Sequence, residues 1–204
     1  MRTLAAVLLL FCVATTAVAQ GSFAGANWTI GFPTGRTNDF ISKTSFGGMG
    51  VDIKRFFDDN ATYGLNFGWS QYSEMVNETA TWPSGALSGT QIRYLNLFPI
   101  SLNADIYFGE KRDELKTFAG LNAGAVMVRM RDDIGIYSFE STSWHFMLAP
   151  EIGFWFPVER GTYVTISARY NYAFDNGIDV FGNDVNKHSW VSLNIGLGWM
   201  QDWF

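Results

Sequence analysis

The chain has 204 residues, a formal net charge of −5 and no run of basic residues, so nucleic acid is not expected as a partner. Aromatic residues reach 17% and charged residues only 16%, and the length suffices for one domain with a sizeable core. Since the overall hydropathy is balanced, we do not expect a long membrane-spanning helix, which needs about 20 apolar residues.

The first residues have the pattern of a secretory signal peptide. Arg2 gives a positive start, residues 4–14 form an apolar segment too short to span a bilayer, and Ala17-Val18-Ala19 fits the small-x-small cleavage pattern. We therefore predict a signal peptide over residues 1–19 and a single barrel domain over residues 20–204. A retained apolar N-terminal helix is the alternative.

Beyond this segment, apolar and polar residues alternate with a period of two almost everywhere, which is the pattern of strands. No stretch has a convincing helical period. The predicted strands cover residues 24–34, 44–56, 62–73, 91–108, 117–131, 143–157, 162–174 and 189–200.

The last predicted strand is the clearest. Val191, Leu193, Ile195, Leu197 and Trp199 share one face, while serine, asparagine and glycine occupy the other. Small polar residues suit a barrel interior, and large apolar residues suit a lipid-facing band. A soluble β-sandwich also alternates, but its strands are usually about five or six residues long and carry more charge outside. We therefore predict an all-β fold, a transmembrane antiparallel up-and-down β-barrel of eight strands.

The predicted connections alternate between short and long, as in membrane barrels with short periplasmic turns and longer external loops. The short or charged turns are 57–61, 109–116 and 158–161, and the longer loops are 35–43, 74–90, 132–142 and 175–188. We thus expect both termini in the periplasm and four loops outside.

Aromatic side chains gather near the predicted strand ends, where membrane barrels have aromatic girdles. We interpret them as two interfacial girdles, with ordinary core aromatics as the alternative. The set includes Trp28, Trp144, Trp199, Tyr72, Tyr107 and Trp190.

The first predicted strand ends in Phe32-Pro33-Thr34-Gly35, and the chain has an aromatic C-terminus. With the strand pattern and loop order, these features make the chain resemble the small bacterial outer-membrane β-barrel family that includes OmpX and the N-terminal domain of OmpA. The likeness covers about residues 21–204. That family carries a C-terminal assembly signal, polar-x-Gly-x-x-aromatic-x-hydrophobic, which the resemblance assigns to Asn194, Gly196, Trp199 and Phe204. Gln201 departs from it, since a hydrophobic residue is expected there.

The resemblance implies an integral, multi-pass location in the bacterial outer membrane. It also implies contact with the lipid bilayer and lipopolysaccharide, and insertion by the outer-membrane assembly machinery. The sequence does not name an extracellular ligand.

Several charged residues fall on the inward face of their strands. A tight turn after Val158 would place Glu151 opposite Arg169, within reach of a salt bridge. Asp52, Lys54 and Asp105 point into the same lumen. We interpret the five as a polar network that plugs the barrel, because eight strands enclose a space that side chains fill. A proton or ion path is the alternative.

Few residues offer chemistry for a cofactor, a metal or catalysis. Cys12, the only cysteine, lies within the predicted signal peptide, and the large Phe11 before it argues against a lipid anchor. His145 and His188 are not at metal-ligand spacing. Residues adjacent in a strand point to opposite faces, so His188-Ser189 cannot form a dyad. We predict no catalytic residue, no cofactor and no metal.

Two classes of function stay open. A structural or surface-interaction barrel would act through its external loops, whereas a transport barrel would pass small solutes or hydrophobic compounds. An outer-membrane lipid-modifying enzyme is a remote third. Loop 74–90 is apolar for an exposed loop, which favours a contact surface. The residues concerned are Met75, Val76, Trp82 and Leu87.

Overall fold

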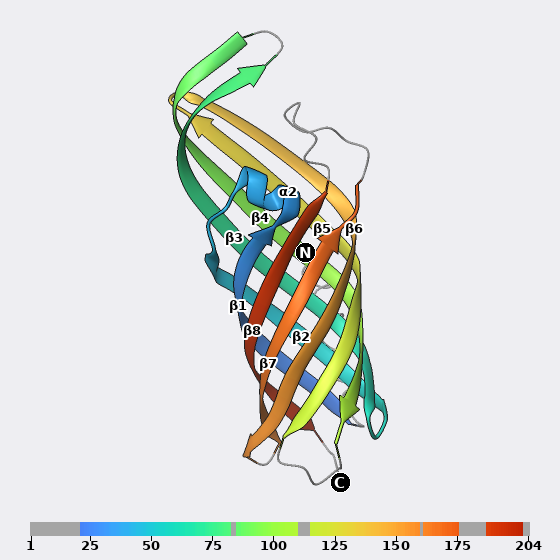
Figure 1. Cartoon of the computed structure of the whole chain (residues 1–204). Coiled ribbons are helices and arrows are strands. Elements are labelled where there is room, and N and C mark those ends of the chain that lie inside the picture. Colours follow the sequence, from blue (N-terminus) through green and yellow to red (C-terminus); the bar gives the residue numbers. More distant parts are fainter. Residues whose placement is uncertain (1–20, 83–84, 110–114, 160, 176–186, 202–204) are drawn as a thin grey trace, which may run out of the picture.

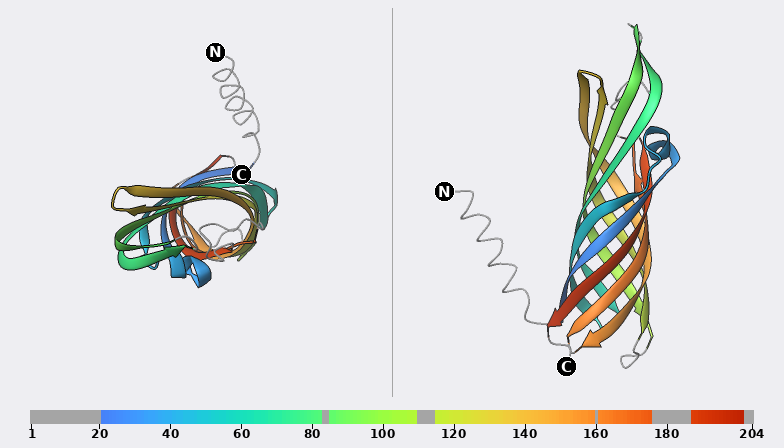
Figure 2. Two further views of the ribbon diagram at one scale, coloured as in Figure 1. Left: turned by 90° about the horizontal axis from the view of Figure 1, so that it is seen from above. Right: turned by 90° about the vertical axis from the view of Figure 1, so that its left-hand side faces the viewer.

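Eight antiparallel strands follow one another in chain order and close into a barrel, with β1 paired to β8 (Figure 1, Figure 2). This computed structural model describes residues 21–82, 85–109, 115–159, 161–175 and 187–201, so the predicted signal peptide lies outside the described residues. The predicted fold class is confirmed. The strands are β1 (Ser22–Thr34), β2 (Ser45–Asp58), β3 (Ala61–Trp82), β4 (Gly85–Phe108), β5 (Lys116–Ile134), β6 (Tyr137–Glu159), β7 (Thr162–Ala173) and β8 (His188–Gln201).

The period-two alternation separates an apolar outer face from the interior. On β8, Leu193, Ile195 and Leu197 are 40% to 45% exposed, whereas Ser192 and Asn194 are buried. Every strand contributes large exposed apolar side chains in this way, and together they form a band around the barrel. Among the described residues, no helix is long and apolar enough to cross a membrane.

Two hairpins extend beyond the level at which the barrel is closed, and they project at the upper left of Figure 1. Strands β3 and β4 pair as far as Trp82 and Gly85, and β5 and β6 as far as Ile134 and Tyr137. The prediction of loops over 74–90 and 132–142 is therefore wrong. Apolar and polar residues still alternate in these segments. Outside the apolar band, however, they no longer form a continuous row of large apolar residues, so the sequence pattern predicted strands that end too early.

A short helix, α2 (Gly35–Phe40), follows β1 and packs against β8 and β1. The sequence analysis placed these residues in the loop 35–43 and found no helical period, because six residues are too few to produce one. Gly35 starts the helix with a φ of 52°, a conformation that glycine adopts without strain. The next residue, Ile41, is fully buried in the upper mouth of the barrel.

Candidate functional site

The interior of the barrel has three layers. The upper layer, at the end with the projecting hairpins, is apolar; the middle layer is charged and polar; the lower layer is aromatic. All five charged residues that the sequence analysis placed in the lumen belong to the middle layer.

One ion pair crosses between neighbouring strands in the middle layer. The register sets Glu151 on β6 directly opposite Arg169 on β7. The Nη2 and Nε atoms of Arg169 donate to Oε2 of Glu151 at 2.8 and 3.0 Å, and both side chains are less than a tenth exposed. The carboxylate also accepts from Ser167 at 2.6 Å and from Asn122 at 3.0 Å. The charge of Glu151 is therefore neutralised and its oxygens are fully used.

A second ion pair joins strands that are not neighbours. Nζ of Lys54 on β2 lies 2.7 Å from Oδ2 of Asp105 on β4. Strand β3 lies between them, and its residue beside Lys54 is Gly64. A Cβ at Gly64 would lie 2.7 Å from the Lys54 backbone, so only glycine fits at this crossing.

Asparagine side chains connect the two pairs. Asp52 accepts hydrogen bonds from Asn27 at 2.8 Å and from Asn66 at 2.9 Å. Asn66 in turn accepts from Nη1 of Arg169 at 2.8 Å, a bond that spans the lumen from β7 to β3. On the other side, Asn122 accepts from Asn103 at 3.2 Å, and Asn103 donates to Asp105 at 2.9 Å.

The same network reaches the remaining strand through hydroxyl groups. Thr29 on β1 donates to Asn194 on β8 at 2.8 Å, and Asn194 donates to Ser167 on β7 at 3.3 Å. All eight strands therefore contribute a side chain to one connected network. The sequence analysis named the charges of this network but not the hydrogen bonds of its asparagines, which occupy inward positions on five strands.

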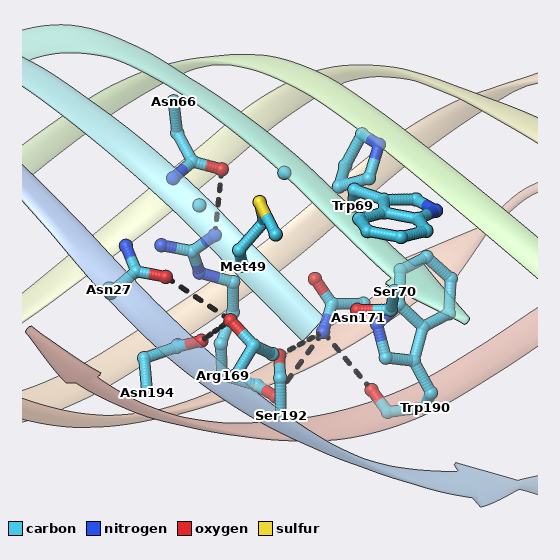
Figure 3. Close-up of a pocket in the computed structure, with 14 residues that line it drawn as sticks. Asn27, Met49, Asn66, Trp69, Ser70, Arg169, Asn171, Trp190, Ser192 and Asn194 are labelled. Carbon is cyan, nitrogen blue, oxygen red and sulfur yellow. Dashed lines mark hydrogen bonds between the residues drawn. The ribbon is translucent and has the colours of Figure 1, made fainter. Parts of the chain in front are cut away.

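A cavity of about 20 Å³ adjoins the network, enough for about one water molecule (Figure 3). Arg169, Asn194 and Trp190 line it from inside, whereas Met49 and Trp69 line it from the outward face. The β3–β4 pairing is interrupted here, between the pairs Phe67–Ile100 and Ser70–Leu97. Pro99 lies in the gap and has no N–H to donate.

Aromatic side chains fill the lower end of the interior. Trp155 and Tyr163 stack with ring centroids 3.9 Å apart, and Tyr107 packs on Phe118 at 5.5 Å. Met200 and the partly buried Phe56 complete the cluster. The girdle interpretation is therefore wrong for Tyr107, which is buried inside the barrel, while Trp28, Trp144 and Trp199 are exposed on the outer face.

The upper layer differs from the expected polar lumen. Tyr72 and Trp190, assigned to the girdles from sequence, are buried here instead. The cluster consists of Ile41, Tyr72, Leu95, Leu97, Val126, Val128, Met130, Met147, Ala149, Ala173 and Trp190. The lumen was expected to be polar, and at this level it is apolar.

The end of α2 and the segment after it close this apolar layer from above. Arg93 lies over the ring of Phe40 at 5.5 Å and donates to its carbonyl oxygen at 3.2 Å. Glu74 accepts from the backbone N–H and the hydroxyl of Ser42 at 2.6 and 2.7 Å. Burial acts to raise the pKa of Glu74, but these bonds and one from the Lys43 backbone outweigh it and lower the pKa. A carboxylate thus holds the segment in place.

The other predicted site residues lie apart from this network, except Asn194. Met75 and Val76 lie on β3, with Met75 67% exposed; Trp82 and Leu87 belong to the same hairpin, and their side chains lie outside the described residues. Gly196 faces inward, where a Cβ would lie 2.5 Å from the Thr165 hydroxyl, and Trp199 is exposed. Phe204 lies outside the described residues.

No family model and no curated protein sequence matches the chain. Several solved structures share the fold at low sequence identity. Neisserial surface protein A has a TM-score of 0.53 and 16% identity, covering 88% of this chain and 95% of its own. OprG of Pseudomonas aeruginosa has a TM-score of 0.51 and 14% identity, covering 89% and 96%. The N-terminal β-barrel domain of Pseudomonas aeruginosa OprF has a TM-score of 0.50 and 14% identity, covering 89% and 100%. The fold is that of the small eight-stranded outer-membrane barrels.

Proposed function

We propose that this chain is an integral protein of the bacterial outer membrane that displays a rigid external sheet for contact with partner proteins and does not conduct solutes. The observation that carries the proposal is the side-chain network of all eight strands, which fills the lumen with paired charges. An eight-stranded barrel is only just wide enough for side chains to fill. In this proposal, residues 1–19 are removed as a signal peptide.

The outer surface supports the membrane location. Exposed apolar residues such as Leu65, Leu102 and Ile152 form a continuous band, and a lipid environment requires a closed sheet without free edges. The partners we propose there are the lipid bilayer and lipopolysaccharide. The C-terminal residues Asn194, Gly196, Trp199 and Phe204 would present the signal for the outer-membrane assembly machinery.

The external sheet supports the interaction role. Above the apolar band, from Met75 to Trp82, β3 pairs only with β4 among the described residues, whereas Ser45 and Ser42 contact the same strand lower down at Gln71 and Glu74. A free strand edge can pair with an extended segment of another protein, and this one contains no proline to prevent it. Met75 and Val76 lie on this edge strand, so we propose them as the contact surface, with Trp82 and Leu87 in the same hairpin.

Removal of the hairpin end tests this role. Deleting residues 78–89 and changing Met75 and Val76 to lysine removes all four proposed contact residues, and it joins Asn77 to Thr90, which already face each other across the hairpin. A peptide display library, panned against the purified chain in lipid nanodiscs, should yield extended peptides that bind wild type and lose binding to the shortened variant. Panning that enriches nothing, or peptides that bind both proteins equally, would contradict the interaction role.

The control is surface display. Ile136, at the tip of the β5–β6 hairpin, is 92% exposed, and Asp59 lies in the turn at the opposite end. In intact cells, a membrane-impermeant maleimide should label Ile136→Cys in both proteins and leave Asp59→Cys unlabelled until the membrane is opened.

Transport of hydrophobic compounds is the second candidate. The apolar upper layer and the interrupted β3–β4 pairing beside Pro99 favour it over transport of polar solutes. In that case an apolar compound would enter from outside and leave sideways near Trp69. The filled middle layer favours the first candidate, because it closes the path along the axis.

A further inference from the structure

The chain contains only two histidines, and the fold brings both together inside the upper mouth. His145 on β6 and His188 on β8 pack edge to face, with ring centroids 5.1 Å apart and planes at 83°. Strand β7 separates β6 from β8 below, but it ends at Ala173, which pairs with both Met147 and His188. The rings therefore meet just above the end of β7.

The hydrogen bonds of His145 are compatible with a neutral ring. Its Nδ1 lies 2.9 Å from the carbonyl oxygen of Phe174, which can only accept, so Nδ1 carries the proton. Its Nε2 lies 2.8 Å from Oγ of Ser143 and accepts from that hydroxyl. Both nitrogens are thus satisfied without a second proton.

The described residues around His188 offer no hydrogen-bond acceptor for a proton on its Nδ1. Its side chain is 1% exposed, and Nδ1 has no hydrogen-bond partner in the described part of the chain. A proton there would lack an acceptor and would lie against the ring of His145, whose centroid is 5.1 Å away.

The charged groups on the surrounding elements have other contacts or face solvent. Glu74 is bound to Ser42, Arg93 lies 3.9 Å from Asp132, and Glu151 is paired with Arg169. The exposed groups near the mouth are Arg36 and Asp39 on α2, Asp175 after β7 and Lys187 before β8.

Ser189, the residue after His188, makes the hydrogen bonds that hold α2 in place. The backbone N–H of Ser189 donates to Oγ1 of the buried Thr37 on α2 at 2.9 Å. Its hydroxyl donates to the carbonyl of Thr34 at 3.0 Å, just before the helix. A movement of His188 toward water would therefore break the contacts that keep α2 over the apolar layer.

We propose that His145 and His188 form a proton-sensitive latch, which holds α2 and Ile41 in the mouth while both rings are neutral and releases them in acid. The sign follows from linkage: a solvent-exposed histidine takes up a proton near pH 6.5, so the released state binds more protons and acid favours it. Uptake of one proton changes the ratio of released to closed chains by up to about tenfold per pH unit. The latch does not depend on which partner the external sheet binds.

Spin labelling of α2 tests the latch in the full chain, with Cys12 replaced by serine. Asn38 is an exposed residue of α2, and Thr142 is an exposed residue of β6 that serves as the control site. A label on Asn38→Cys should be immobilised at about pH 8 and mobile at about pH 5, while a label on Thr142→Cys should not change. No change at Asn38 across this range would overturn the proposal.

Two variants identify the proton acceptor. His188→Phe keeps an aromatic ring and should abolish the change at Asn38; where this variant does not fold, as judged by heat-modifiable migration on gels, His145→Phe takes its place. Asp39→Asn should keep the change, because Asp39 is an exposed acidic residue of α2 and is not one of the two histidines. If the histidine variants keep the pH response, or if Asp39→Asn loses it, the histidine latch is wrong.

Discussion

Arg169→Met is expected to lower the free energy of unfolding by about 3–5 kcal/mol, because it leaves the buried carboxylate of Glu151 without a countercharge. The double variant Glu151→Gln with Arg169→Met should lose less than this single change, since no buried charge is then unpaired. A double-mutant cycle, measured by urea unfolding in lipid vesicles, gives the coupling between the two residues.

An exposed ion pair provides the control for this cycle. Arg129 and Glu140 are in closer contact, with Nε and Oε1 2.6 Å apart, but their side chains are 52% and 40% exposed. Solvent screens such a pair, so its coupling should be small. Equal coupling in the two cycles, or none between Glu151 and Arg169, would mean that water fills the lumen and that the interior is not a plug.

The second large effect concerns the outer face. Leu65→Arg, on the apolar band of β3, is expected to destabilise the barrel by about 2–4 kcal/mol, because the arginine must enter the lipid. Gln71→Arg on the same strand also points outward but lies above the band, so it should have little effect. Refolding into vesicles, followed on gels, measures both. If the two variants fold equally well, the apolar band does not face lipid.

The barrel could be predicted because the two faces of a membrane strand, one apolar and one polar, are visible in the sequence as alternating residues. Leu193, Ile195 and Leu197 alternate with small polar residues, and the structure exposes the first set and buries the second. The pairing of Glu151 with Arg169 could be predicted for the same reason, since a tight turn leaves little choice of register.

The upper layer could not be predicted in this way, because the apolar face changes sides along one strand. On β5, Leu121 faces outward within the band, whereas Val126 and Val128 face inward and the next outward residue is the exposed Arg129, although no residue is inserted. A strand that leaves the lipid has water outside and a core inside, so the pattern reverses. This switch of the apolar residues from outward to inward positions can be read from the sequence. It also marks the level at which β3 and β5 leave the membrane.

The alternation of residues along one strand does not predict contacts between segments that are far apart in the sequence. His145 and His188 both lie on inward positions, but their meeting depends on where β7 ends, and the alternation does not define that end. The asparagine links were missed for a related reason: Asn66 reaches Arg169 across the lumen, from a strand that is not its neighbour.

The central claim is that side chains of all eight strands close the lumen, and single-channel recording tests it most directly. At neutral pH, purified chain inserted into planar bilayers should give no stable open-channel current, because Lys54 is paired with Asp105 and Arg169 with Glu151 inside the barrel. Steady unitary currents from the wild-type chain, abolished by antibody or protease treatment of the same preparation, would contradict a sealed barrel and make transport the better account of its function.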